Sequence, residues 1–386
     1  MPWSDRRGST AMACVSTALI VGGGIAGLSA AVALARVGVH CDVVELADAP
    51  GGASLALSGR ATEALDELGV YDECYARSTP FTAGTTAATL MDAQGRLISA
   101  GPQRPRWPGA KTPIGLHRPV LLEILEDTAR RLGVKIYKGV TTRSTDERDD
   151  GSFVTLTDGR QARYDFVVGA DGIGSRTRSQ LFPTSPGPTY AGQFSLRWML
   201  PGPPVEGEGW YVGPVGRVGF YHLPQGLIYI PAVVDMPEPV RMSDEEVFAL
   251  FSRLLDSYTA PAMVELKRRL TPDADLICRP FEWILLPAPW HRGRTILIGD
   301  AAHATTAHMG MGGGMAIEDA VVLAQCVASA PTLTAAFDTF MTRRFSRVST
   351  VVETSVALSR LEQENAPPAE NMALLTAAFT TLGQPY

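Results

Sequence analysis

The sequence predicts an α/β protein: a discontinuous Rossmann-like nucleotide-binding domain, a second domain built on an antiparallel β-sheet, and C-terminal helices. Residues 18–45 read as strand, glycine turn, helix and strand, and two later uncharged strands end in Gly-Ala-Asp-Gly and Gly-Asp. Residues 190–286 instead alternate with period two and are rich in aromatic side chains, as in an antiparallel sheet. A length of 386 residues exceeds the usual size of one domain, which favours two.

The opening unit is the strongest local signal. Gly22, Gly24 and Gly27 have the G-x-G-x-x-G spacing at which a chain turns tightly, approaches a pyrophosphate and packs helix on strand. Glu45 closes the second strand about 20 residues later, where a carboxylate can accept hydrogen bonds from ribose hydroxyls. The pattern predicts a dinucleotide site; the alternative is a buried αβ layer whose glycines only allow close packing. The unit alone does not distinguish FAD from NAD.

The remaining elements follow in order. Helices are expected at 60–68, from Arg118 to a stop at Gly133, at 244–257, from near Gly313, and at 335–358. A hairpin is expected at 88–98 and further strands at 134–137, 153–156, 166–168, 281–285 and 294–298. Residues 102–111 are proline-rich and irregular, and the tail past Gln363 is expected to be weakly packed.

We expect the nucleotide-binding domain to comprise residues 12–75, 102–183 and 287–360. The second domain would comprise 76–101 and 184–286, with a C-terminal tail at 361–386. Residues 1–11 read as a leader, and Met12 is a candidate biological start. No apolar run long enough for a signal peptide or a membrane span is found outside the glycine-rich unit.

Composition excludes some classes of partner. A net charge of −6 gives no electrostatic footprint for nucleic acid. The five cysteines are scattered without C-x-x-C pairing, so they indicate neither a disulfide framework nor a zinc site. We expect reduced thiols in a cytoplasmic protein that is a monomer or a homodimer.

Three separated signatures stand together: the glycine turn with Glu45, the run Gly169 to Arg178 (GADGIGSRTR), and Gly299 to His303 (GDAAH) followed by Gly310 to Gly314 (GMGGG). With them the sequence resembles the class A single-component FAD-dependent aromatic hydroxylases, the flavoprotein monooxygenases of the para-hydroxybenzoate hydroxylase fold. The resemblance extends from about Thr17 to Ser355.

The resemblance implies FAD as cofactor and NAD(P)H as co-substrate. Asp300 would accept hydrogen bonds from the ribityl chain, Asp171 would lie beside the pyrophosphate, and Arg118 would reach the flavin from its helix. The glycines from Gly312 would open a helix facing the pyrimidine end of the flavin. The implied cofactor-binding residues are Gly22, Gly24, Ala26, Gly27, Glu45, Ala53, Arg118, Asp171, Asp300, Gly312 and Gly313.

The chain departs from the family pattern at two positions. Leu46 stands where an arginine usually follows the ribose-binding acid, which puts one adenosine contact in question. Ala307 stands where a proline is common in the loop against the flavin, which weakens any inference about pocket shape. His303 and His308 in this region fit no common metal-site spacing, so no metal is expected.

The implied reaction is hydroxylation of an aromatic or N-heteroaromatic small molecule by O₂ through a flavin C4a-hydroperoxide. Candidates for the substrate pocket come from the aromatic sheet: Arg197, Tyr211, Tyr221 and His222, with Tyr229 beside them. Arg197 is the preferred substrate contact, and a satisfied sheet histidine is the ordinary interpretation of His222. Because strand side chains alternate, Tyr221 and His222 should lie on opposite faces.

Two alternatives remain open. A monooxygenase of the same fold could act on a non-aromatic substrate, by epoxidation for example. A dinucleotide-binding protein without redox activity would have little need for the Gly299-Asp300 loop.

Overall fold

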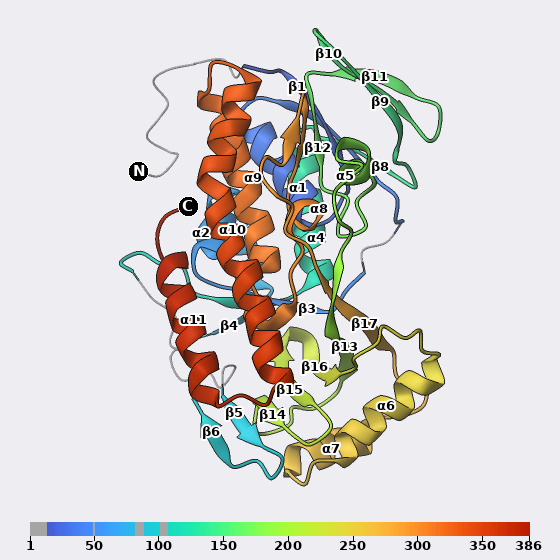
Figure 1. Cartoon of the computed structure of the whole chain (residues 1–386), viewed down its shortest axis with the longest axis vertical. Coiled ribbons are helices and arrows are strands. Elements are labelled where there is room, and N and C mark those ends of the chain that lie inside the picture. The colour runs from blue at the N-terminus through green and yellow to red at the C-terminus, as the bar shows by residue number, and fades with distance from the viewer. Residues whose placement is uncertain (1–13, 49–50, 82–88, 101–106) are drawn as a thin grey trace.

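Figure 1 shows the computed structural model of the chain, which describes residues 14–48, 51–81, 89–100 and 107–386. The expected leader at 1–11, residue 88 of the expected hairpin and residues 102–106 of the proline-rich segment lie outside these residues. None of the helices among the described residues is long and apolar enough to cross a membrane.

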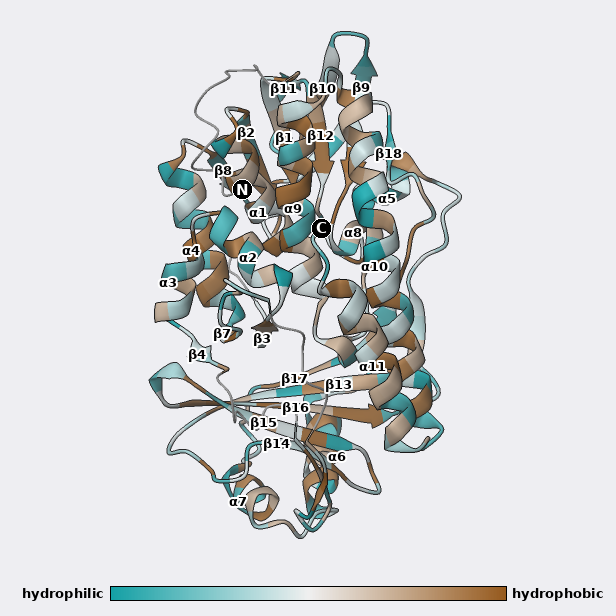
Figure 2. Cartoon of the chain, turned by 90° about the vertical axis from the view of Figure 1, so that its left-hand side faces the viewer, coloured by the Kyte–Doolittle hydropathy of each residue, from teal (hydrophilic) through white to brown (hydrophobic). Residues whose placement is uncertain are grey.

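A six-stranded sheet forms the centre of the first part of the molecule. It runs in the order β18 (His291–Arg292), β19 (Thr295–Leu297), β12 (Phe166–Gly169), β1 (Thr17–Val21), β2 (His40–Glu45) and β8 (Lys135–Lys138). All neighbours are parallel except β18 and β19. The central strands carry no charge because both faces of the sheet are covered, and Figure 2 shows the apolar colour on β1 and β12.

Helices cover this sheet. The helix α1 (Ile25–Arg36) packs against α9 (Gly312–Ser329) and α4 (Arg118–Arg131). Smaller helices complete the layers: α2 (Arg60–Glu67), α3 (Tyr71–Ala76), α5 (Arg176–Leu181) and α8 (Asp300–His303). Two three-stranded sheets flank the layers: β9 (Thr142–Arg148), β10 (Gly151–Leu156) and β11 (Gln161–Tyr164) in one, and β3 (Ser54–Leu57), β4 (Thr79–Pro80) and β7 (Ile114–His117) in the other.

The second sheet has seven strands, in the order β17 (Leu276–Trp283), β13 (Thr189–Pro201), β16 (Leu227–Asp235), β15 (Arg217–Leu223), β14 (Gly209–Val212), β5 (Leu90–Asp92) and β6 (Leu97–Ser99). It is antiparallel except between β14 and β5. One face packs on α6 (Asp244–Asp256) and α7 (Pro261–Arg269), where Leu196, Trp198 and Phe220 are buried. The predicted fold class is therefore confirmed.

The long helix α10 (Leu333–Gln363) joins the two parts, as Figure 1 shows. It packs on α9, and its last turns reach β13. There Ser359 Oγ donates to Gln193 Oε1 at 2.6 Å, and Gln363 Nε2 donates to the carbonyl oxygen of Ala191 at 2.9 Å. The polar contacts fix the second sheet against the end of this helix.

The expectation of a weakly packed tail is wrong. Residues Pro368–Leu382 form the helix α11, which packs along α10. Its Ala378, Phe379 and Leu382 are buried in the main core. The tail is ordered because these side chains remove apolar surface from water once α10 provides a surface for them.

Candidate active site

The three glycines of the opening turn differ in what the fold requires of them. A Cβ at Gly22, which has φ of 110°, would lie 2.3 Å from the carbonyl oxygen of Ala170, and one at Gly27 would lie 1.8 Å from that of Gly22. Close packing of the backbone therefore requires glycine at both Gly22 and Gly27. At Gly24 the nearest atom to a Cβ is Arg118 Nη2, at 4.0 Å, and φ is an ordinary −78°. Packing therefore does not require glycine at position 24, and the first turn of α1 is left open there, where a helix N-terminus can bind an anion.

Glu45 lies beside this turn, at the carboxyl end of β2. Its Oε2 accepts from the Gly23 N–H at 2.5 Å, and its Oε1 accepts from the Ala47 N–H at 2.7 Å. These bonds orient the carboxylate and leave each oxygen with capacity for a second donor, such as a ribose hydroxyl. Leu46, the next residue, is 61% exposed.

Asp300 reaches the same place from the other end of the chain. A Cβ at Gly299, with φ of 58°, would lie 2.7 Å from the Cβ of Ala26, so this turn packs directly on α1. The Asp300 side chain is open to solvent, yet desolvation by the surrounding protein raises the pKa of its carboxyl against the opposing charges of His303 and Arg118. The Asp300 carboxyl is thus reached by solvent yet closely surrounded by protein, and we call the space that it borders with Glu45 and Arg118 the cleft.

Arg118 lines the cleft between Glu45 and Asp300. Burial lowers the pKa of its guanidinium, the charges of Asp300 and Glu45 raise it, and the charge of Arg197 lowers it further. Its Nη1 donates to the carbonyl oxygen of Gly51, and its backbone N–H donates to that of Ala53 at 2.8 Å. The first turn of α4 is thereby held against the segment that follows β2.

Asp171 is engaged within its own loop. Its carboxylate accepts from Ser175 Oγ at 2.5 Å, from the Thr177 N–H at 2.9 Å and from Thr177 Oγ1 at 3.0 Å. These bonds shape the turn into α5. The neighbouring Gly172 has φ of 78° and no atom within 4 Å of a Cβ, so backbone N–H groups and space are what this loop offers to a ligand.

The start of α9 is open in the same way as that of α1. At Gly313 a Cβ would have no neighbour closer than 3.7 Å, whereas at Gly314 it would lie 2.9 Å from Ala61. At Gly312 the nearest atom is Thr305 Cγ2, at 3.3 Å. The cleft therefore has two open helix N-termini, two carboxylates and an arginine along its length, and this set fits an elongated dinucleotide such as FAD.

The second sheet contributes side chains from the face opposite α6 and α7. Strand alternation places Arg197 of β13, Tyr221 of β15 and Tyr229 of β16 on this face, together with Trp210 of β14, whose ring centroid lies 6.4 Å from that of Tyr221. Burial raises the pKa of both tyrosines, and the charge of Arg197 partly offsets the shift at Tyr229. Because Arg197 also acts on the pKa of Arg118, it lies where the two parts meet.

Two of the candidate pocket residues lie on the other face. Tyr211 is 3% exposed, stacks on Phe220, and donates its hydroxyl to the carbonyl oxygen of Gly207 at 2.7 Å. It belongs to the core under α6 and α7, so its expected place in the pocket is wrong. His222 Nε2 accepts from the Val205 N–H at 3.0 Å, and Nδ1 lies 2.9 Å from Glu208 Oε1. Both ring nitrogens are engaged, which favours the satisfied sheet histidine.

The two loop histidines are each engaged by neighbouring side chains. His303 Nε2 lies 2.6 Å from Asp319 Oδ2, and both side chains are buried. His308 Nδ1 lies 2.9 Å from Thr306 Oγ1, and its Nε2 lies 3.2 Å from Glu362 Oε2. Across the part of the chain that the structure describes, no group of three His, Cys, Asp or Glu side chains could hold a metal ion.

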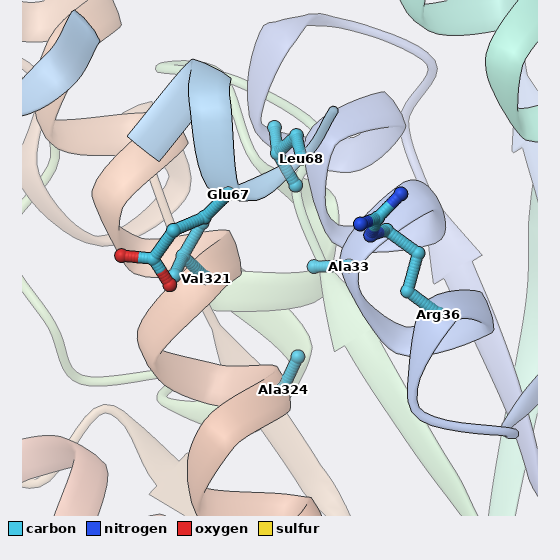
Figure 3. A pocket seen from close by; sticks show the side chains of 6 residues that line it. All are labelled: Ala33, Arg36, Glu67, Leu68, Val321 and Ala324. Atoms are coloured by element: carbon cyan, nitrogen blue, oxygen red, sulfur yellow. The ribbon is translucent and has the colours of Figure 1, made fainter. Parts of the chain in front are cut away.

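A separate hollow lies between α1, α2 and α9 (Figure 3). Its lining residues are Ala33, Arg36, Glu67, Leu68, Val321 and Ala324. It has room for little more than a water molecule and contains none of the residues above, so it is not the dinucleotide site.

Comparison with known proteins identifies the family of the chain. The FAD binding domain family matches residues 15–355. The chain belongs to this family of FAD-dependent monooxygenases. Aurachin C monooxygenase/isomerase of Stigmatella aurantiaca is 32% identical over 366 residues, 91% of each chain. FAD-dependent urate hydroxylase of Klebsiella oxytoca is 30% identical over 383 residues, 95% of this chain and 94% of that one. The crystal structure of Klebsiella pneumoniae HpxO with FAD and uric acid shares the fold, with a TM-score of 0.78 at 23% identity over 95% and 96% of the chains.

In this flavoprotein, sequence reasoning missed residues that hold the cofactor loops from behind. Arg178 Nη1 donates to the carbonyl oxygen of Ala301 at 3.0 Å and Nη2 to that of Ile173 at 2.7 Å, which ties the Asp171 loop to the Asp300 turn. Asp319 and Arg344 form a buried ion pair behind α8. The sequence signal that could have found these residues is that they are charged side chains within otherwise apolar helical segments.

Proposed function

We propose that this monooxygenase hydroxylates an aromatic or N-heteroaromatic small molecule, with NAD(P)H as reductant and O₂ as oxygen donor. One oxygen atom enters the ring and the other leaves as water. Bound FAD supplies the activation of O₂. Gly22, Gly24, Glu45, Arg118 and Asp300 would hold it in the cleft described above. Five unpaired cysteines fit the reducing cytoplasm, where we place the protein.

The main support for the proposal is the Arg197 guanidinium and its surroundings. Its Nε donates to Ser195 Oγ at 3.1 Å, and among the described residues no carboxylate pairs with it. A guanidinium at this meeting point, beside Tyr229, retains donors for an acidic group of the substrate. Its charge favours the anion of a ring hydroxyl or ring N–H, and that anion makes the ring carbon a better nucleophile toward oxygen.

The two tyrosines bind the substrate and exclude water, and they do not accept the proton that the substrate loses. Because burial keeps the pKa of Tyr221 and Tyr229 above the usual value, both phenols are neutral at physiological pH. Together with Trp210 they give a planar ring an aromatic surface, and they limit the access of water to the reacting atoms.

The test is a panel of phenols and N-heterocycles screened for oxidation of NADH and NADPH that yields oxygenated product. Arg197→Met should raise KM for the accepted substrate roughly ten- to 150-fold, from the loss of about 1.5–3 kcal/mol of charged hydrogen bonding. Arg241→Met, at an exposed position in the loop before α6, is the control and should leave KM unchanged. Normal KM in the Arg197 variant, or no oxygenated product from any phenol or N-heterocycle, contradicts the proposal.

A further inference from the structure

A cluster of charged side chains lies in the core behind the Asp300 turn. Glu318, Asp319 and Arg344 are fully buried, and His303 and Arg347 are 2% and 8% exposed. They come from α8, α9 and α10, which pack together here. Buried charges are destabilising unless each is paired or hydrogen-bonded, so each charged group in this cluster needs partners.

Asp319 binds both ends of the turn that carries Asp300. Its Oδ2 accepts from the Gly299 N–H at 3.0 Å and lies 2.6 Å from His303 Nε2, while its Oδ1 accepts from Arg344 Nε at 2.7 Å. Gly299 precedes Asp300 directly, and His303 follows it by one turn of α8. The Asp319 carboxylate therefore fixes both the backbone at Gly299 and the side chain of His303, which flank Asp300 in the turn.

The charge of Asp319 is maintained in this setting. Burial by itself raises the pKa of its carboxyl, but His303, Arg344 and the Gly299 N–H together hold that pKa below the usual value. The carboxylate thus stays an acceptor for the turn.

Glu318 offers an internal contrast. Its carboxylate pairs with Arg344 Nη1 at 2.7 Å and with Arg347 Nε at 2.7 Å, and Arg347 donates to the carbonyl oxygen of Leu382 at 2.8 Å. Glu318 is as buried as its neighbour, but its ion-pair partners lie on α10 and not on the Asp300 turn. The two adjacent acids thus face different parts of the molecule.

We propose that Asp319 is a positioning residue for Asp300: it sets the Gly299–His303 turn so that the Asp300 carboxylate faces the cofactor cleft, and FAD affinity depends on it. The inference rests on the cofactor-binding role proposed above for Asp300. It does not depend on which substrate is hydroxylated.

The experiment is a double-mutant cycle on FAD affinity, measured by flavin fluorescence with the full-length apoprotein. Asp300→Asn and Asp319→Asn should each weaken FAD binding at least ten-fold. Asp319→Asn should change the dissociation constant less than two-fold on the Asp300→Asn background, because its effect passes through Asp300. A merely structural role would lower affinity equally on both backgrounds, and that result overturns the proposal.

Glu318→Gln is the matched control. It disturbs the same buried cluster, so it should lower the Tm of the apoprotein while FAD affinity stays within two-fold of wild type. Equal losses of affinity for Glu318→Gln and Asp319→Asn would show a general effect of destabilisation and overturn the assignment.

Three further outcomes each have a defined meaning. If Asp319→Asn does not fold, His303→Gln replaces it and should weaken FAD binding on the wild-type background only; no loss there contradicts the proposal. If Asp300→Asn binds FAD normally, the assumed role of Asp300 is wrong and this inference falls with it. If Asp300→Asn loses affinity but Asp319→Asn does not, only the inference falls. Neither result bears on hydroxylation, which the substrate panel tests.

Discussion

Substitution of Gly24 by alanine separates a glycine required by a ligand from one required by the fold. A Cβ at this position would meet no protein atom closer than 4.0 Å, and the backbone φ of −78° suits any residue. Alanine is a poorer helix N-cap than glycine, which costs the apoprotein about 0.5–1 kcal/mol. If the pyrophosphate lies against the N–H groups here, the methyl group displaces it and removes a charged hydrogen bond of about 1.5–3 kcal/mol. FAD affinity should then fall roughly ten- to 150-fold.

The assay compares two quantities in Gly24→Ala: the dissociation constant for FAD, from fluorescence titration of the apoprotein, and the Tm of that apoprotein. The Tm should fall by no more than about 2 °C, since 1 kcal/mol moves Tm little in a chain of this size. Gly187→Ala serves as the control, because its Cβ would have no neighbour within 4 Å and Gly187 belongs to none of the three cofactor motifs. Wild-type FAD affinity in Gly24→Ala would refute the placement of the pyrophosphate.

Three further predictions follow from the contacts described above. FAD affinity should decrease as pH falls through the raised pKa of Asp300, because protonation removes an acceptor; a titration of Asp300→Asn should lack this dependence. Glu362→Ala should lower the free energy of unfolding in urea by about 1–3 kcal/mol, because Arg217 and the buried His308 both lose their carboxylate partner. Arg217 Nη1 lies 2.6 Å from Glu362 Oε1 in the wild type. An unchanged midpoint of the urea unfolding transition would contradict this prediction. Tyr211→Phe should cost about 1 kcal/mol of stability through its lost bond to Gly207 and leave kcat/KM within about two-fold; a ten-fold loss of kcat/KM would return Tyr211 to the pocket.

The cofactor motifs could be predicted because their chemistry is local. A tight turn, an open helix N-terminus and a carboxylate after a strand each need particular residues at fixed spacing, as at Gly22 and Glu45. The aromatic sheet was predicted from alternation, and its opposite placement of Tyr221 and His222 agrees with the structure. Alternation shows only which residues share a face of the sheet, however, and does not show which face the helices cover. Nothing local to Tyr211 indicates that its side of the sheet is the one covered by α6 and α7.

The supporting residues could not be predicted for a related reason. Asp319 and His303 are 16 positions apart, and Arg344 is 25 positions beyond Asp319, so their contacts exist only once three helices have packed. The helix α11 was missed because its apolar side chains have meaning only against the surface of α10. Local pattern thus predicts the turns and strand ends that border the cleft, while the side chains that hold them in place depend on long-range assembly.

The position of β19 in the central sheet has a consequence for biosynthesis. Its residues Thr295–Leu297 pair with β12, yet they leave the ribosome about 275 residues after β1, a delay of roughly 15–55 s at ordinary translation rates. During that interval the edge of β12 lacks its neighbour, and the turn that carries Asp300 has not been synthesised. A nascent chain stalled before this point would expose a strand edge open to misassembly, and on the role proposed for Asp300 it would lack one of the groups that hold the flavin.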